Sequence, residues 1–313
     1  MSSTAANLIS SIDALDQIYL IKDACAWAGI SKGRANRYAE LLRELLQENR
    51  RSQEHLKAWH ESSDITEMHQ LWGKKTDLFP RFKSKIRTAL KDGPLLSVEE
   101  NASSTNRARN DSFNYLLAGR LLGAGLDVLA VDGCAREFEE TQWMGDITLR
   151  HGGAVLDIQC KRPWSQNSLI DNIKRAKSQV VTVANPARGI IAIDLSRCIS
   201  LNDAYASSDE ASESLHAKVV QLLSPEVHRL LGQAPQIVGL IAFASIPAEV
   251  VYLSSVLSSD GTPYTSRYLH SVGHTRLLIN EQSPHSDILK SLYGNLEMWY
   301  RSHMKTLKAS GDM

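Results

Sequence analysis

The segment 145–162 constrains the fold more than any other part of this 313-residue chain. Its two halves are rich in β-forming residues and flank Gly152 and Gly153, which can adopt the positive φ angles of a two-residue hairpin turn. A turn at these glycines predicts a β-hairpin and sets its register. The facing pairs are His151 with Ala154, Leu149 with Leu156, Ile147 with Ile158, and Asp146 with Gln159.

Because side chains alternate between the two faces of a strand, this register predicts one apolar face and one polar face. The apolar face carries Ile147, Leu149, Leu156, Ile158 and Cys160. The polar face carries Asp146, Thr148, Asp157, Gln159 and Lys161. Paired Cβ atoms lie about 5 Å apart, so a carboxylate, an amide oxygen and an ammonium group converge. Oxygen ligands beside a cation suit Mg²⁺-assisted attack on phosphate. The alternative is an ordinary hairpin with one solvated face.

Regular elements are predicted on both sides of the hairpin. Apolar residues recur at helical spacing over 112–124, and an apolar strand follows over 126–131. After Pro163 a second amphipathic helix runs from Ser168 to about Val183, and a nearly all-apolar strand spans 189–195. The order is α-β-β-β-α-β, which predicts an α/β core in which helices cover both faces of a mixed sheet.

This order, together with Gly145-Asp146 and the triplet Gln159-Cys160-Lys161, resembles the PD-(D/E)XK superfamily of restriction-endonuclease-like nucleases. The Gln-x-Lys form is similar to Mrr-like restriction nucleases, and the resemblance covers roughly residues 111–195. It implies a restriction-endonuclease-like fold and a metal-dependent nuclease that hydrolyses the phosphodiester bonds of DNA in restriction or phage defence. Asp146, the Gln159 side chain and the Cys160 backbone carbonyl would hold Mg²⁺ or Mn²⁺. Lys161 would orient the attacking water or stabilise charge, and Gln179 would position a phosphate or the water.

The chain departs from this family at two positions. The family usually has a glutamate on the first helix, and the closest residue here is Asn114, an uncharged amide. Gln159 also replaces a carboxylate with a neutral ligand. Asp146 is then the one carboxylate expected to bind the metal, and Asp157 is an alternative carboxylate on the same face. These departures favour an alternative function, a non-catalytic nucleic-acid-binding subunit with a decayed nuclease fold. A third hypothesis is a protein-binding scaffold, against which the retained Lys161 argues.

The amino-terminal part is predicted to be an all-α domain over residues 1–96, joined by a polar linker at 97–111 to the nuclease-like domain, 112–313. Residues 21–38 have the outline of a helix-turn-helix, with a bend at Gly29 and Ile30 plugging the core. In that interpretation Lys32, Arg34 and Arg37 project outward to nucleic acid. An ordinary helical hairpin is the alternative.

The chain has 35 basic and 35 acidic residues, so no global positive field indicates a nucleic-acid partner. The region 74–91 is nevertheless basic, with seven Lys and Arg residues against Asp77. Lys83, Lys85 and Arg87 are predicted phosphate contacts there, whereas many such runs are solvated helix faces. The aromatic residues Trp72, Phe79 and Phe82 accompany this run.

The four cysteines show no paired spacing, which predicts neither zinc ligands nor disulfides and fits a reducing cytoplasm. The first twenty residues lack the basic start of a secretory signal. The longest apolar region, 237–253, contains Pro247 and is predicted to form two strands with a break rather than a membrane span. A terminal helix is expected over 286–305. These features predict a cytoplasmic protein with no membrane contact. Its predicted partner is DNA, with a second copy of the chain or defence-system proteins as further partners.

Overall fold

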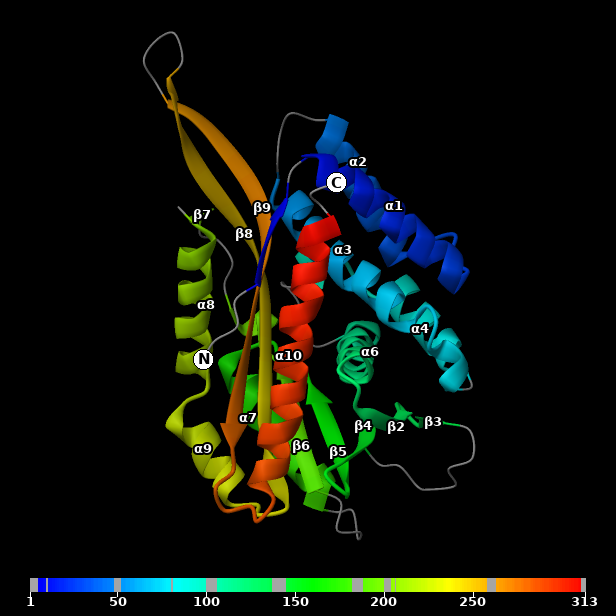
Figure 1. The fold of residues 1–313 in the computed structure, drawn as a ribbon, viewed down its shortest axis with the longest axis vertical. Helices are drawn as coiled ribbons and strands as arrows, with labels where there is room; N and C mark the ends of the chain where they lie inside the picture. The colour runs from blue at the N-terminus through cyan, green and yellow to red at the C-terminus, as the bar shows by residue number, and fades with distance from the viewer. Residues whose placement is uncertain are drawn as a thin grey trace.

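The computed structural model describes residues 5–9, 11–47, 52–79, 81–99, 106–136, 145–181, 188–199, 204–205, 207–257 and 263–310. It is an α/β protein built on one mixed, nine-stranded sheet with helices on both faces (Figure 1). The strand order along the sheet is β1-β9-β8-β6-β5-β4-β2-β3, and β7 pairs with β8. Neighbouring strands are antiparallel except in the pairs β5–β6, β6–β8 and β7–β8.

The strands differ greatly in length. The sheet centre and its long hairpin consist of β2 (Asp127–Val131), β4 (Ile147–His151), β5 (Ala154–Lys161), β6 (Arg188–Asp194), β8 (Ile237–Leu257) and β9 (Pro263–Ile279). Shorter strands add β1 (Ala5–Ile9), β3 (Cys134–Ala135) and β7 (Ala204–Tyr205). The β8–β9 hairpin extends well past the other central strands (Figure 1).

The predicted hairpin register is confirmed. Strand β4 pairs with β5 as expected from Ile147↔Ile158 to His151↔Ala154, and Gly152 and Gly153 form the turn with φ of 57° and 73°. The polar face, however, is not solvated: Thr148 and Asp157 are buried, and the Thr148 hydroxyl donates to Asp157 Oδ1 at 2.6 Å. A buried carboxylate with a hydroxyl donor is satisfied without water.

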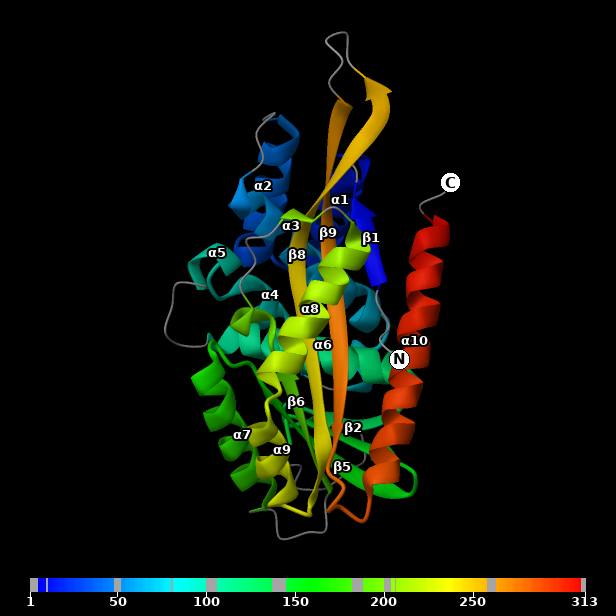
Figure 2. The ribbon, with the colours of Figure 1, turned by 90° about the vertical axis from the view of Figure 1, so that its left-hand side faces the viewer.

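Two hydrophobic clusters lie on opposite faces of the sheet. One joins α6 (Arg107–Gly123) and the amino-terminal helices to Ile147, Ile158 and Cys160. The other joins α7 (Gln166–Val181), α8 (Ser208–Leu222) and α9 (Pro225–Gly232) to Ile191 and Ile193. Figure 2 shows α7, α8 and α9 in front of the sheet. The terminal helix α10 (Ser286–Ser310) packs on the first cluster through Leu289, Leu292 and Leu296.

The predicted core order is present as α6, β2, β4, β5, α7 and β6, with the short β3 added. Helix α6 begins five residues earlier than expected, because the Asn106 side chain accepts a hydrogen bond from the Arg109 amide and caps it. The predicted linker 97–111 is therefore wrong at both ends. Helix α5 (Leu96–Glu99) occupies its start and α6 its end, while 100–105 lie outside the described residues.

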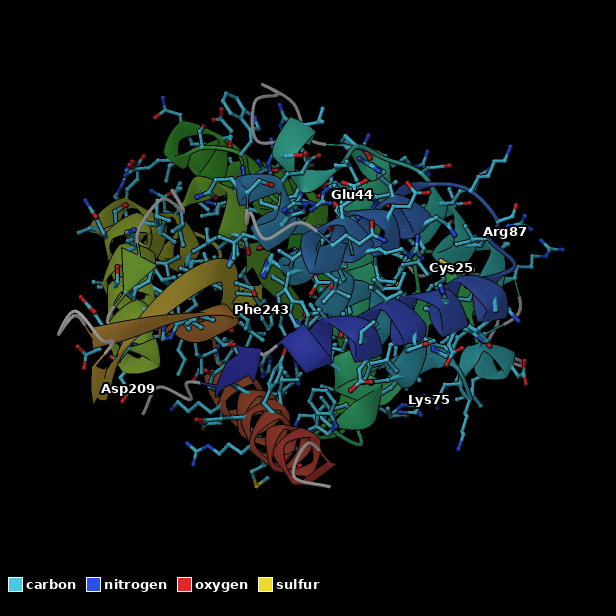
Figure 3. All side chains as sticks on the ribbon, turned by 90° about the horizontal axis from the view of Figure 1, so that it is seen from above. Cys25, Glu44, Lys75, Arg87, Asp209 and Phe243 are labelled. Carbon is cyan, nitrogen blue, oxygen red and sulfur yellow. The ribbon has the colours of Figure 1, made fainter. Side chains whose placement is uncertain are left out.

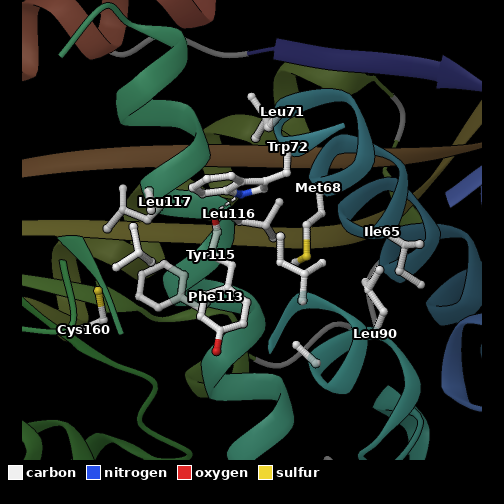
Figure 4. Close-up of a cluster of buried hydrophobic side chains, with 14 of the residues drawn as sticks. Ile65, Met68, Leu71, Trp72, Leu90, Phe113, Tyr115, Leu116, Leu117 and Cys160 are labelled. Carbon is white, nitrogen blue, oxygen red and sulfur yellow. Dashed lines mark hydrogen bonds between the residues drawn. The ribbon is translucent and has the colours of Figure 1, made fainter. Parts of the chain in front are cut away.

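The predicted separate, all-helical domain at 1–96 is also wrong. Helices α1 (Ser11–Ala28), α2 (Arg34–Gln47), α3 (Gln53–Trp72) and α4 (Phe82–Lys91) are present with the 3-10 turn Thr76–Leu78, but β1 joins the sheet through β9. The helices share one core with α6 (Figure 4). Within it, Trp72 Nε1 donates to the Tyr115 carbonyl at 2.8 Å. Apolar residues before and after the polar segment 97–111 are buried in the same core, so the polar composition of that segment does not mark a border between domains.

Strand β8 does not break at Pro247, contrary to expectation. Pro247 pairs with Ser271 of β9, and on the opposite side β6 has already ended at the Asp194↔Phe243 pair while β7 begins only at Glu249. A proline lacks an amide proton, so a stretch with no partner strand on one side tolerates it. Among the helices within the described residues, none has the length and apolar character of a membrane span.

Candidate functional site

Asp146 lies immediately before β4, at the open end of the β4–β5 hairpin. Its Oδ2 accepts the backbone N–H of Cys160 at 2.8 Å, and its carbonyl accepts the backbone N–H of Asp132 at 2.8 Å. The carboxylate is therefore tied to β5, and the backbone is tied to the turn after β2. Glycine at position 145 allows the backbone before Asp146 to lie close to β5, because a Cβ there would come within 3.1 Å of the Asp157 Cβ.

Lys161 is the last residue of β5 and meets Asp146 across this open end. Its Nζ lies 3.8 Å from Asp146 Oδ2, and the two side chains are 15% and 30% exposed. The structure thus brings together the predicted acid and the predicted cation. They are close enough to share one ligand and accessible enough for that ligand to enter.

A pocket of about 390 Å³ opens at this point between α6 and α7. It is lined by Arg107, Asn110, Asp111, Phe113, Asn114, Asp146, Cys160, Lys161, Arg162 and Asn172. Asn114 therefore reaches the site as predicted for the first helix. Asp111, one turn earlier on α6, adds a carboxylate that was not among the site residues predicted from the sequence. Residues three apart are neighbours on a helix surface, so once the start of α6 is known, the spacing of Asp111 and Asn114 indicates that both face the pocket.

Burial is the largest influence on the pKa of both carboxylates. Burial raises the pKa of Asp146, while Lys161 and the Cys160 N–H act in the opposite direction. Burial also raises the pKa of Asp111, and the nearby Asp132 and Asp146 carboxylates add to this rise. A cation bound between Asp111 and Asp146 would offset this repulsion.

The pocket lining combines the cations Arg107, Lys161 and Arg162 with oxygen donors that could hold a hard cation. Its side-chain oxygens come from carboxylates and amides, which suit Mg²⁺ or Mn²⁺. The Cys160 thiol is a poor ligand, because burial raises its pKa well above the ordinary value. Within the described residues no group of three His, Cys, Asp or Glu side chains is arranged to hold a metal ion. An ion here would take two carboxylates and complete its shell with neutral oxygens and water.

Three other predicted site residues lie elsewhere. Gln159 is only 3% exposed, on the α7 face of β5, and is not among the pocket-lining residues. Asp157 lies on the same face and accepts from Thr148 rather than facing the pocket. Gln179 is exposed on α7, about 10 Å along the helix from the pocket residue Asn172. The alternation of side chains along β5 correctly predicted the face on which Gln159 lies. Helix α7 covers that face, however, and the pocket lies at the end of the strand.

The amino-terminal bend resembles the expected helix-turn-helix only in part. Gly29 has a φ of 67° and Ile30 is buried, as predicted. The outward projection of Arg34 is wrong: it is 5% exposed and binds Glu61 and the Ala89 carbonyl. Arg37 is paired with two glutamates of its own helix, Glu40 and Glu44. Lys32 is exposed. Because α2 packs against α3 and α4, Arg34, the middle one of the three residues predicted to contact nucleic acid, is buried.

Helix α4 carries the later part of the basic run, Lys83, Lys85, Arg87 and Lys91. Lys83 and Arg87 are exposed, and Figure 3 shows Arg87 extending away from the body of the molecule. Lys85 instead binds Asp132, with its Nζ 2.6 Å from Oδ2. The accompanying aromatic residues are core residues rather than a stacking surface, since Trp72, Phe79 and Phe82 are fully buried.

Comparisons with known proteins identify no relative: no family model matches the chain, and neither a curated protein nor a solved structure matches it at a significant level.

Proposed function

We propose that this protein is a metal-dependent nuclease that hydrolyses phosphodiester bonds of DNA, with its active site in the pocket between α6 and α7. The observation that carries the proposal is the 3.8 Å approach of Lys161 Nζ to Asp146 Oδ2 in a pocket that also contains Asp111. Two carboxylates and one ammonium group in one pocket are the groups that metal-assisted phosphate chemistry needs. The proposal is also supported by the order of α6, the β4–β5 hairpin, α7 and β6, which resembles that of restriction-endonuclease-like enzymes.

Asp146, Asp111 and the backbone carbonyl of Cys160 would hold Mg²⁺ or Mn²⁺. When bound, such an ion polarises a phosphate oxygen and lowers the pKa of a coordinated water. The Cys160 N–H on Asp146 Oδ2 keeps that carboxylate in one orientation. Gln159, which the family resemblance assigned as a ligand, is not needed in this arrangement.

Lys161 would act directly on the reacting phosphate. Its ammonium group can donate to a non-bridging oxygen and offset the negative charge that develops during attack. The Asp146 carboxylate leaves N–H donors of this ammonium group for a phosphate oxygen, because the 3.8 Å separation is longer than a direct hydrogen bond. Arg107, whose side chain is 92% exposed at the pocket wall, can neutralise a neighbouring phosphate.

The test is incubation of the purified chain with plasmid, linear duplex and single-stranded DNA in Mg²⁺, Mn²⁺ or EDTA. Cleavage is expected with a divalent ion, with loss in EDTA and in Lys161→Ala. The matched control is Lys290→Ala, which removes an exposed lysine that is paired with Asp287 on α10 and is not among the pocket-lining residues. Cleavage that survives in Lys161→Ala would contradict the proposal.

A second candidate function is a nucleic-acid-binding subunit without catalysis. It is favoured by the amide Asn114 in the pocket and by the absence, within the described part of the chain, of a group of three His, Cys, Asp or Glu side chains that could hold a metal ion. DNA binding in EDTA that Lys161→Ala and Asp146→Asn leave unchanged, with no cleavage in any metal, would establish it instead of the nuclease.

A further inference from the structure

Lys85 of α4 reaches a turn that directly supports Asp146. Its Nζ donates to both the Asp132 carboxylate, at 2.6 Å, and the Asp132 carbonyl, at 2.5 Å. The Tyr115 hydroxyl donates to the same carboxylate oxygen at 2.9 Å. Asp132 thus receives hydrogen bonds from α4 and α6 at once.

The turn that Lys85 holds has an uncommon backbone. Asp132 and Gly133 have φ of 47° and 72°, and a positive φ is infrequent for any residue other than glycine. From this turn the Asp132 N–H donates to the Asp146 carbonyl at 2.8 Å. The carboxylate of Asp146 is held separately by the Cys160 amide. The position of Asp146 therefore depends on Asp132 on one side and on β5 on the other.

We infer that Lys85 is a positioning residue: by fixing the Asp132 turn, it holds Asp146 in place beside Lys161 in the pocket that also contains Asp111, where the proposed divalent cation would bind. The inference rests on the proposed function, and it gives the amino-terminal helices a role in the site. It also replaces the prediction that Lys85 contacts phosphate, since its ammonium group is already bound to two oxygens of Asp132. Residues that orient metal ligands typically change metal affinity by about 10–100-fold when they are removed.

The experiment compares Lys85→Met, Lys85→Arg and Tyr115→Phe with the control Lys290→Met, whose lysine also pairs with an aspartate. The first measurement is hydrogen exchange of the Asp132 and Cys160 amides, which donate to Asp146. Faster exchange is expected in Lys85→Met, a smaller effect in Tyr115→Phe, near-normal exchange in Lys85→Arg and no change in the control. Unchanged exchange at both amides in Lys85→Met would overturn the inference.

The second measurement is Mn²⁺ titration, read by calorimetry and by the half-maximal metal concentration for DNA cleavage. Lys85→Met should raise this concentration about 10-fold while leaving kcat at saturating Mn²⁺ within about 3-fold of wild type. Altered exchange with an unchanged metal midpoint would overturn the positioning role. Weaker DNA binding in EDTA with an unchanged metal midpoint would instead make Lys85 a phosphate contact. A wild-type protein that binds no Mn²⁺ would overturn the proposed function, and hydrogen exchange would then decide alone whether Lys85 fixes Asp146.

Discussion

The ammonium nitrogen of Lys161 lies 3.8 Å from Oδ2 of Asp146, across the open end of the β4–β5 hairpin. Both side chains lie at the end of a ladder whose core-facing residues Ile147, Leu149, Leu156 and Ile158 are fully buried. The pair can therefore be changed without removing the core beneath it. This separation of site from core makes the catalytic predictions testable in folded protein.

Lys161→Ala should lower DNA cleavage by at least about 100-fold, the scale for losing one electrostatic contact made in the transition state. Thermal unfolding should remain close to wild type, because the lysine is at the strand end. Cleavage rates at saturating metal and melting curves check both statements. A parallel fall in melting temperature and activity would indicate a structural role.

Asp111→Asn should weaken divalent-ion binding, since it removes one of the two carboxylates in the pocket. Asn114→Glu, which adds an acid to the same wall, should retain activity or change the preference between Mg²⁺ and Mn²⁺. Metal titrations of cleavage for both variants provide the measurement. Equal metal affinity in Asp111→Asn and wild type would remove Asp111 from the site.

Salt-dependent DNA binding tests the exposed cations of α4 and the α1–α2 loop. Replacing Lys32, Lys83 and Arg87 with alanine should flatten the slope of log binding constant against log salt by about one unit for each lost phosphate contact. Anisotropy titrations in EDTA separate this effect from cleavage. An unchanged slope in the triple variant would show that these residues form an ordinary solvated surface. Arg34→Ala should instead reduce stability, because Arg34 is buried on Glu61.

Glu99 is 1% exposed in its side chain and pairs with Arg162, Arg109 and Arg197. Glu99→Gln should destabilise the fold by about 3–5 kcal/mol, because it removes the carboxylate charge that three buried guanidinium groups share. The exposed pair of Glu297 and Arg301 supplies the control, in which Glu297→Gln should change stability by at most about 1 kcal/mol. Urea unfolding of both variants gives the comparison. Equal losses would contradict the buried-charge argument.

Asp64 should make stability fall as pH rises. Burial raises its pKa to about 7, with the Glu61 carboxylate adding to the rise, from an ordinary value of 3.8. Between these values the folded state binds more protons than the unfolded state, so the stabilising contribution is full below about pH 4 and is lost as pH passes 7. Asp64→Asn should therefore stabilise the protein more at pH 8 than at pH 5, as melting temperatures at the two pH values would show. An equal shift at both would exclude this linkage.

The sequence by itself determined the hairpin, its register and the approach of Asp146 to Lys161. These are local consequences of a Gly-Gly turn and of strict two-residue alternation, which allow one pairing once the turn is placed. The order of helices and strands from α6 to β6 followed from apolar periodicity in the same way.

Tertiary packing decided what surrounds those residues. Helix α7 covers the face that carries Gln159 and Asp157, and the earlier start of α6 brings Asp111 into the pocket. Packing of α2 and α4 on α3 and α6 buries Arg34 and directs Lys85 to Asp132. A residue pattern shows that a side chain is polar or charged, but it does not show which residue will be its partner. The partner of Lys85 is 47 residues away in the sequence, and the partner of Arg34 is 27 residues away. Which cations remain in solvent is therefore a property of the assembled core, because burial makes ion pairing obligatory wherever a charge is enclosed.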